Sequence, residues 1–414
     1  MPDISEHFAP IENAIRTEFL PALLGGTAPT IISPALRALL ALPVKAAGVG
    51  LPDPTATADI HHSTSTVCTA VLTDSLLDHT PLSIASHQQA MREGRAATTA
   101  AKTSAATTTL LILSAPMSKQ DARRTTRNTE TGAWISITPT TVNGLTLSKD
   151  EWRDAMRRRY GLAMLDMQKN CDGCGAKFTI EHALACKKGG LVVGRHNEVN
   201  AETGMIAIQA LGSNRVRDEP KIITCRDTPF PRAPASARSH HSHPSSPPPP
   251  TSSSSSTEPQ DTQGHFFDRG DLLVQGLWDK QTACVLDTRV MDTDQPSYRH
   301  STPMQALASQ ERVKKKRYQE LCFEQRRHFT PYVVCASGLL GAEAKALNKR
   351  LALLLSQKWK SPYSVTCGYV NARMSVAILR ATHLCVRGSR VPFRHASSKI
   401  AQWDDGAGLN LLRT

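Results

Sequence analysis

The amino-acid sequence predicts a mixed α/β (α+β) protein with a helical N-terminal region, a small cysteine-histidine knuckle and a mixed sheet flanked by helices. Three observations support this fold class. Apolar residues recur at helical spacing before residue 82, three Cys and one His fall within sixteen residues near the middle, and strand-like runs precede amphipathic segments after residue 270. With 414 residues, the chain is long enough for two or three domains.

Residues 1–82 are expected to be helical. Ile11–Leu24 carries apolar residues near the helical period and is followed by two glycines, which favour the end of a helix. A short helix is expected at Ala35–Leu42, because a proline and a turn-rich segment follow it. Val67–Leu77 is predicted to be a further helix of this region.

Residues 83–149 form an Ala/Thr-rich connecting region with weak periodicity. Two interpretations stay open for Ser83–Met117, a long helix of modest propensity or a loose connector. Asp150–Gly161 is a clearer helix, with an acidic first turn and a basic last turn. Its Arg157 and Arg158 are predicted to contact nucleic-acid phosphates, although a solvated helix face explains them equally well.

The strongest motif lies at the end of the region 150–190. Cys171 and Cys174 are separated by two residues, which suits a tight turn that aims two thiolates at one ion. His182 and Cys186 are four residues apart, so on a helix they lie on one face. This spacing predicts a closed, structural Zn²⁺ site, and it outweighs the alternative that the cysteines are simply buried as small apolar residues.

The region 191–400 is predicted to hold the sheet. A helix is expected at His196–Leu211 and a short strand at Lys221–Thr224. Residues 226–263 contain Pro and Ser runs without an apolar pattern and are predicted to be a disordered insertion. The elements expected after the insertion are a hairpin of Asp271–Trp278 and Ala283–Val290, a basic helix at Gln305–Gln325, a strand at Pro331–Cys335, helices at Ala342–Trp359 and Asn371–Val386, and a frayed tail at 401–414.

The composition indicates the class of partner and the compartment. Lys and Arg outnumber Asp and Glu by 49 to 36, and the resulting charge of +13 favours a polyanionic partner, unless the chain is an ordinary basic protein. Ten cysteines in 414 residues are too few for a disulfide scaffold. With neither a signal segment nor a long apolar run in the sequence, we expect a soluble intracellular protein, nuclear or cytoplasmic, without a membrane partner.

Acidic residues of the region 191–400 suggest a second metal site. Asp271 opens the first strand of the expected hairpin, and Asp287 lies near the end of the second. Arg289 shares a strand face with Asp287 because strand side chains alternate, and Glu198 lies on the preceding helix. Converging carboxylates can hold Mg²⁺ for phosphodiester chemistry, but acids at strand ends are more often solvated or paired with Arg.

The order of these motifs resembles a known family. Cys-x2-Cys-x7-His-x3-Cys, then GG, RHNE and an acid-bearing hairpin, resembles the C-terminal part of non-LTR (LINE-type) retrotransposon polyproteins. In the similar branch, a zinc knuckle and a restriction-enzyme-like endonuclease follow the reverse transcriptase. EWRDAMRRRYG, DLLVQGLW, CVLDTRVMDTDQPSY and VKKKRYQ follow in the order that such elements show. The resemblance covers most of the chain, and residues 1–82 resemble the segment after the polymerase core.

The resemblance implies a PD-(D/E)xK-type nuclease within residues 191–400. The implied site comprises two acids, a basic residue, a helix acid and two flanking residues: Asp271, Asp287, Arg289, Glu198, Lys316 and Tyr318. Three positions depart from the pattern. Gly270 replaces a common proline, Ser337 stands where an Asp is expected, and Arg289 replaces a lysine, so it can stabilise charge but cannot act as a base.

The functional expectation is a DNA-binding module that nicks DNA with Mg²⁺, from a truncated retroelement reading frame in which the polymerase is missing. Its partners would be DNA and, as a second candidate, the element RNA. Lys314, Lys315 and Lys316 are predicted to contact phosphates, unless they are only a solvated helix face. The alternatives are a non-catalytic zinc-dependent nucleic-acid-binding module and an inactive remnant. Whether Glu198 or Glu219 completes the acid cluster stays open.

Overall fold

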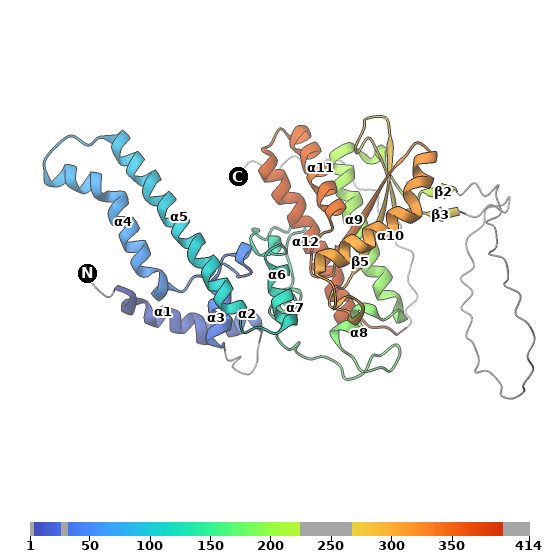
Figure 1. Cartoon of the computed structure of the whole chain (residues 1–414), viewed down its shortest axis with the longest axis horizontal. Helices are drawn as coiled ribbons and strands as arrows, with labels where there is room; N and C mark the ends of the chain where they lie inside the picture. The colour runs from blue at the N-terminus through green and yellow to red at the C-terminus, as the bar shows by residue number, and fades with distance from the viewer. Residues whose placement is uncertain (1–3, 26–31, 224–266, 392–414) are drawn as a thin grey trace, which may run out of the picture.

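The computed structural model describes residues 4–25, 32–223 and 267–391 as a mixture of helices and a small mixed sheet (Figure 1). The α-helices are α1 (Ala9–Ala14), α2 (Leu20–Leu24), α3 (Pro34–Ala41), α4 (Pro54–Leu77), α5 (Ile84–Ser114), α6 (Lys119–Asn128), α7 (Lys149–Tyr160), α8 (Ile180–Ala185), α9 (Leu191–Leu211), α10 (Pro303–Glu324), α11 (Ala342–Trp359) and α12 (Tyr363–Arg387). The strands are β1 (Val216–Asp218), β2 (Lys221–Ile223), β3 (Phe267–Arg269), β4 (Leu272–Gln275), β5 (Ala283–Met291) and β6 (His328–Cys335). The predicted mixed fold class is confirmed.

The N-terminal helices share a hydrophobic core with the C-terminal helix. A π-helical turn, Ile15–Phe19, joins α1 to α2, and Gly25 ends α2 in the left-handed conformation at φ 73°. Helices therefore lie where Ile11–Leu24 and Ala35–Leu42 were expected. The side chains of this core come from α2, α3, α7 and α12, and they include Leu20, Leu24, Leu40, Met156, Val376 and Leu379. Helices α2 and α12, which are far apart in sequence, thus belong to one packed unit.

Helices α4 and α5 form a long antiparallel pair that extends from the rest of the molecule (Figure 1). The prediction for α4 was too short, because the helix begins at Pro54 and the Asp53 carboxylate caps it by accepting the N–H of Thr55. The Ser83–Met117 segment is helical and not a loose connector. Small residues let the two helices approach closely, since Thr64 and Thr98 hydroxyls lie 2.6 Å apart and a Cβ at Gly94 would overlap Cys68 Sγ.

The predicted hairpin forms the centre of a four-stranded sheet in the order β1-β4-β5-β6. β1, β4 and β5 pair antiparallel, whereas β6 runs parallel to β5 and is reached through α10. A separate two-stranded ribbon pairs β2 with β3. The short strand expected at Lys221–Thr224 is present as β2, whereas β1 and β3, which are also three residues long, were not predicted.

The sheet is covered on both faces. Leu272, Val274 and Leu286 pack in the main core with residues of α9, α11 and α12, whereas Val285 packs with Tyr318 and Cys322 of α10. In Figure 1, α10 crosses in front of the strands and α11 and α12 lie to one side. Both α9 and α12 begin before their predicted starts, by five and eight residues, at Leu191 and Tyr363.

The sequence also predicted helix α7, an insertion, a tail and no membrane-spanning segment. Helix α7 matches Asp150–Gly161 within one residue, with the expected acidic first turn and basic last turn, and a Ser148–Glu151 capping box begins it. The proposed insertion 226–263 and the tail 401–414 lie outside the described residues. Among the helices of residues 4–25, 32–223 and 267–391, none has the length and apolar character that crossing a bilayer requires.

Candidate metal centre and carboxylate site

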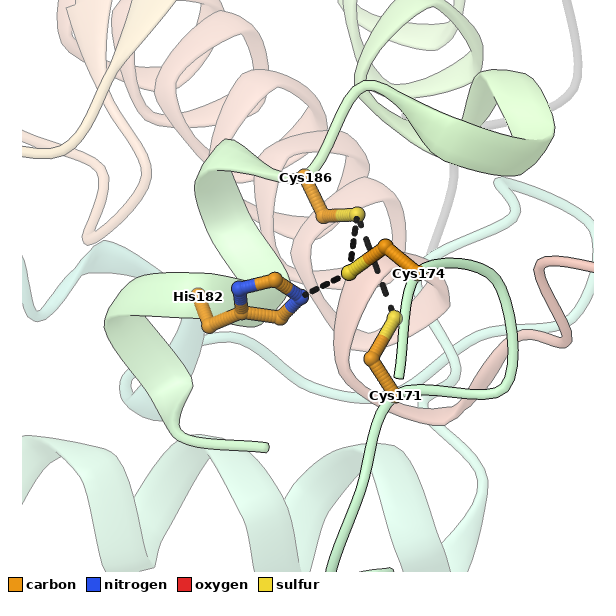
Figure 2. A group of neighbouring side chains, drawn as sticks. All are labelled: Cys171, Cys174, His182 and Cys186. Carbon is orange, nitrogen blue, oxygen red and sulfur yellow. Dashed lines mark hydrogen bonds between the residues drawn. The ribbon is translucent and has the colours of Figure 1, made fainter. Parts of the chain in front are cut away.

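The four predicted metal ligands converge on one point (Figure 2). Cys174 Sγ lies 3.4 Å from His182 Nε2, and Cys186 Sγ lies 3.9 Å from the Sγ atoms of both Cys171 and Cys174. All four ligand atoms lie within 4.8 Å of one another. A tetrahedral ion with metal–sulfur bonds of about 2.3 Å needs ligand atoms about 3.8 Å apart. The cluster therefore has the dimensions of a four-coordinate metal site, and the predicted convergence of the four side chains is confirmed.

The electrostatics of the cluster favour a thiolate. Burial opposes ionisation of Cys171, but hydrogen bonds from His182 and from the backbone N–H groups of Gly173 and Cys174 outweigh it and lower its pKa to about 6. A thiolate is the form of cysteine that binds metals. Cys171 is therefore ready to coordinate an ion at neutral pH.

The knuckle is fastened to the end of α12 by Arg390. This side chain is 1% exposed, its guanidinium lies 4.9 Å from the Phe178 ring centroid, and it donates to the carbonyl of Ala183. The Asp172 carboxylate accepts the backbone N–H of Arg390 at 2.7 Å. Gly189 packs against the same residue with φ 71°, and a Cβ there would lie 2.4 Å from Arg390 Cα. Gly189 of the GG pair is thus needed for this close contact.

The two predicted hairpin acids form a second site. Asp271 precedes β4, where its Oδ2 accepts the Thr288 N–H at 2.5 Å and its Oδ1 lies 3.1 Å from His196 Nε2. Asp287 lies on β5, and Lys314 Nζ of α10 is 2.7 Å from its carboxylate. Asp287 is 6% exposed and Asp271 is half-buried, so the site combines these two carboxylates with a cation and an imidazole.

The pKa values of the two carboxyls are pushed apart. Burial raises the pKa of Asp287 to about 6, and the neighbouring Asp271 charge adds to this effect while Lys314 opposes it. Burial also opposes ionisation of Asp271, but the hydrogen bond and charge of His196 and the N–H of Thr288 outweigh it and lower its pKa. Two carboxyls whose pKa values differ in this way are typical of functional sites.

This difference predicts how stability changes with pH. Between pH 4 and 6, Asp287 holds a proton in the folded state that it has lost in the unfolded state, so the free energy of unfolding falls as pH rises. In Asp287→Asn this loss, on the order of 1–3 kcal/mol, should disappear. Urea unfolding of both proteins from pH 4.5 to 7 without added Mg²⁺ measures it. Equal pH dependence in the two proteins would contradict the buried, protonated Asp287.

The basic residue of the site is Lys314, and sequence reasoning had assigned it to phosphate contacts. The resemblance had implied Lys316, which is exposed. One face of α10 carries the inward-facing side chains at helical spacing: Leu307, Glu311, Lys314, Tyr318 and Cys322. Lys316 lies outside this stripe. In the sequence, only the helical spacing of the apolar residues could have distinguished Lys314 from Lys316. Tyr318 flanks the site, as the resemblance implied, and its ring centroid lies 5.9 Å from Lys314 Nζ. Burial raises the pKa of Tyr318 to about 12.

Helix α9 contributes His196 and Asn200 to the site, and not Glu198. Asn200 Oδ1 accepts the Thr288 hydroxyl at 3.2 Å, next to the His196–Asp271 contact. Glu198 is exposed, because a position two residues beyond His196 is rotated about 200° around the helix. Glu219 is exposed as well and pairs with Arg269 at 2.6 Å. The structure therefore brings neither glutamate to the two aspartates.

The other predicted basic residues occupy different environments. Arg289 is exposed on β5. Lys315 forms an ion pair with Glu343, whereas Lys316 has no recorded partner in the described part of the chain. Arg157 is 6% exposed and donates to the Leu24 carbonyl at the end of α2, so neither predicted role, phosphate contact or solvated face, describes it. Arg158 is half-buried and close to the acidic loop that follows β5.

Comparison with known proteins adds no relatives to this description. No protein-family model matches the chain, and no curated protein matches it. The interpretation of both sites accordingly depends on the geometry and chemistry of their own side chains.

Proposed function

We propose that the chain is the DNA-binding and DNA-nicking module of a non-LTR retrotransposon protein, which hydrolyses one phosphodiester bond with Mg²⁺. The observation that carries this proposal is the pairing of Asp271 and Asp287 beside Lys314 at one edge of the hairpin. Taking the Asp287 carboxylate and the Lys314 ammonium out of water costs free energy. Perturbed groups of this kind cluster at functional sites. In a nuclease, carboxylates bind a divalent ion, and a nearby cation offsets the charge on the phosphate.

The two carboxylates fit Mg²⁺ as partial ligands. Mg²⁺ in phosphoryl-transfer sites is bound by one or two protein carboxylates together with water and substrate phosphate. Among the described residues, only the knuckle brings three or more potential metal ligands together, so the aspartates supply two ligands at most. When bound, Mg²⁺ would activate water and neutralise charge on the phosphate.

The surrounding residues have separate roles in this proposal. His196 and the Thr288 N–H hold the Asp271 carboxylate in place. Lys314 keeps a positive charge at Asp287, where it can offset the charge that develops on the phosphate. Arg289 lies on the same strand face two residues further along and is exposed, so it can reach a phosphate outside the pair. Asp287 must be ionised for this chemistry, so activity should rise with pH.

A restriction-endonuclease-like fold is the finer assignment that we propose for α9, the sheet and α10. A mixed sheet flanked by helices supports it, with Asp287 on β5, Asp271 just before the adjacent β4 and a basic residue on the helix that covers them. We also propose that the ion of the knuckle is a structural Zn²⁺. Three sulfur ligands and one imidazole favour Zn²⁺ over the harder Mg²⁺ and Ca²⁺, and no position of the tetrahedron is left for catalysis.

The direct test of the proposed function is a plasmid assay. The purified chain should convert supercoiled DNA to the nicked circle with Mg²⁺ and not without it. The second candidate is a non-catalytic binding module, and one observation favours it: the Lys314 ammonium already neutralises Asp287. DNA binding without metal-dependent cleavage would support the module and exclude the nuclease.

Phosphate contacts by α10 provide a further prediction. Lys316 is exposed, whereas Lys314 and Lys315 are engaged with Asp287 and Glu343. Lys316→Ala should therefore lower the slope of log affinity against log salt for duplex DNA by about 0.9, the value for one phosphate. Lys315→Ala is the matched control and should change the slope less. An unchanged slope in Lys316→Ala would show that this lysine is only a solvated residue.

A further inference from the structure

A cavity of about 200 Å³ lies where the helices α6, α7, α8 and α12 meet the loops that follow β5 and β6. Four arginines line it: Arg124, Arg127, Arg158 and Arg159. In Figure 1 this junction lies between the N-terminal helices and the sheet. Because the arginines come from two helices, α6 and α7, their concentration here is produced by the fold and was not evident from the sequence.

Two of the arginines that line the cavity, Arg127 and Arg158, have donors without a hydrogen-bond partner among the described residues. Arg127 is 6% exposed and donates Nη1 to Asp294 at 2.8 Å, but its buried Nε has no hydrogen-bond partner. Arg158 makes no recorded hydrogen bond to a described residue, although the charges of Asp292 and Asp294 are near it. By contrast, Arg159 donates to the Asn128 carbonyl and Arg124 to Asp121. A buried donor without a partner costs free energy, so a ligand that accepts from it is stabilised.

The charge around the cavity also favours an anion. Four guanidinium groups share the lining with three carboxylates, those of Glu181, Asp292 and Asp294, so one positive charge is in excess. Asp294 is also paired with Arg127. Burial lowers the pKa of Arg158, the Asp292 charge opposes this shift, and the adjacent Arg127 charge adds to it. Burial likewise lowers the pKa of Arg159. A bound anion would relieve both effects.

The cavity suits a small tetrahedral oxyanion. Its volume is several times the roughly 30 Å³ that one water occupies in the liquid, so one oxyanion fits together with water molecules that can bridge it to the lining. Guanidinium groups match phosphate oxygens with paired N–H donors. Asn128 and Ser337 add an amide and a hydroxyl to the lining.

We propose that this cavity binds a phosphate group through Arg127 and Arg158. The assignment is independent of the nicking activity. The site touches α8, which carries the knuckle ligand His182, and the loop after β5, the strand that carries Asp287. A bound phosphate would therefore stabilise the contact between the knuckle and the sheet.

Isothermal titration of the full, zinc-loaded chain with inorganic phosphate at constant ionic strength tests the proposal. We expect one saturable site, and Arg158→Met should weaken binding by at least about tenfold, since charge-assisted hydrogen bonds are lost. Arg158→Lys keeps the charge and loses the paired donors, so its affinity for phosphate should lie between those of the parent and Arg158→Met. The control is Arg312→Met, an exposed arginine of α10, which should bind as the parent does. Zinc content and far-ultraviolet circular dichroism verify folding.

Two sources of phosphate are separated by competition. If a 5′-phosphorylated trinucleotide displaces inorganic phosphate and the 5′-hydroxyl form does not, the site takes the end of a nucleic-acid strand. If neither competes, the site takes the free ion; both results support a phosphate site. Absence of saturable binding by the folded parent, or equal affinities of the parent and Arg158→Met, would overturn the proposal and leave a water-bridged ion pair between Arg158 and Asp292.

Discussion

Asp287→Asn should all but abolish Mg²⁺-dependent nicking of supercoiled DNA, with a rate loss of about 10²–10³, while DNA binding stays near the parent value. The variant keeps the size of the side chain but removes the charge, so one of two carboxylate ligands is lost at a site with no third acid among the described residues. Removal of one preorganised electrostatic group from an active site typically costs about 10²–10³ in rate. Single-turnover nicking rates and fluorescence anisotropy without Mg²⁺ measure the two quantities.

Asp279→Asn is the matched control, because Asp279 belongs to the loop of the same hairpin and pairs only with His328 in the described structure. It should nick as the parent does. Arg289→Lys should keep part of the activity, since it retains a charge on the same exposed position. If Asp287→Asn cleaves as fast as the parent, the carboxylate pair is not catalytic and the binding-module interpretation replaces the nuclease.

The sequence predicted best the elements whose causes are local. Helix α7 has its own capping box and a left-handed Gly161, and its bounds were correct within one residue. Helix α4 packs on α5 through small residues, such as Thr64 against Thr98 and Cys68 against Gly94, and so it needs no stripe of large apolar side chains. Its first half was therefore missed. The added turns of α9 and α12 are likewise stabilised by tertiary burial, as Leu191 and Thr366 show, and not by periodicity.

The same distinction explains the two sites. The knuckle has all its ligands within sixteen residues, so spacing was sufficient to predict their convergence. Asp271 and Asp287 belong to one hairpin, and they too could be placed together. His196 and Lys314 reach the site from α9 and α10, which the sequence could not dock onto the sheet. The buried roles of Arg157 and Arg158 depend on contacts with α2 and the loop after β5, which are distant in sequence.

Cys174→Ser should eliminate zinc from the purified chain, from one ion to none, and should unfold the knuckle. Cys174 is exposed, so the substitution creates no cavity, and the loss can be ascribed to the missing thiolate. In small structural sites the apparent binding energy of zinc is about 10–16 kcal/mol, which is folding energy for the segment around it. Arg390 connects that segment to the end of α12, and Cys385 and Val386 share its core, so disorder should extend into the last turn of α12.

Metal analysis and limited proteolysis distinguish this result from a general loss of stability. Proteolytic cleavage should become rapid between residues 165 and 190. The core that contains Ile206, Leu286 and Leu351 should stay folded and resist cleavage, because the knuckle contributes no side chain to it. Cys68→Ser, a half-buried cysteine of α4 far from the knuckle in sequence, should retain one zinc and the parent cleavage pattern. Parent protein without zinc, or a Cys174→Ser variant that holds zinc as tightly as the parent, would contradict a four-ligand site.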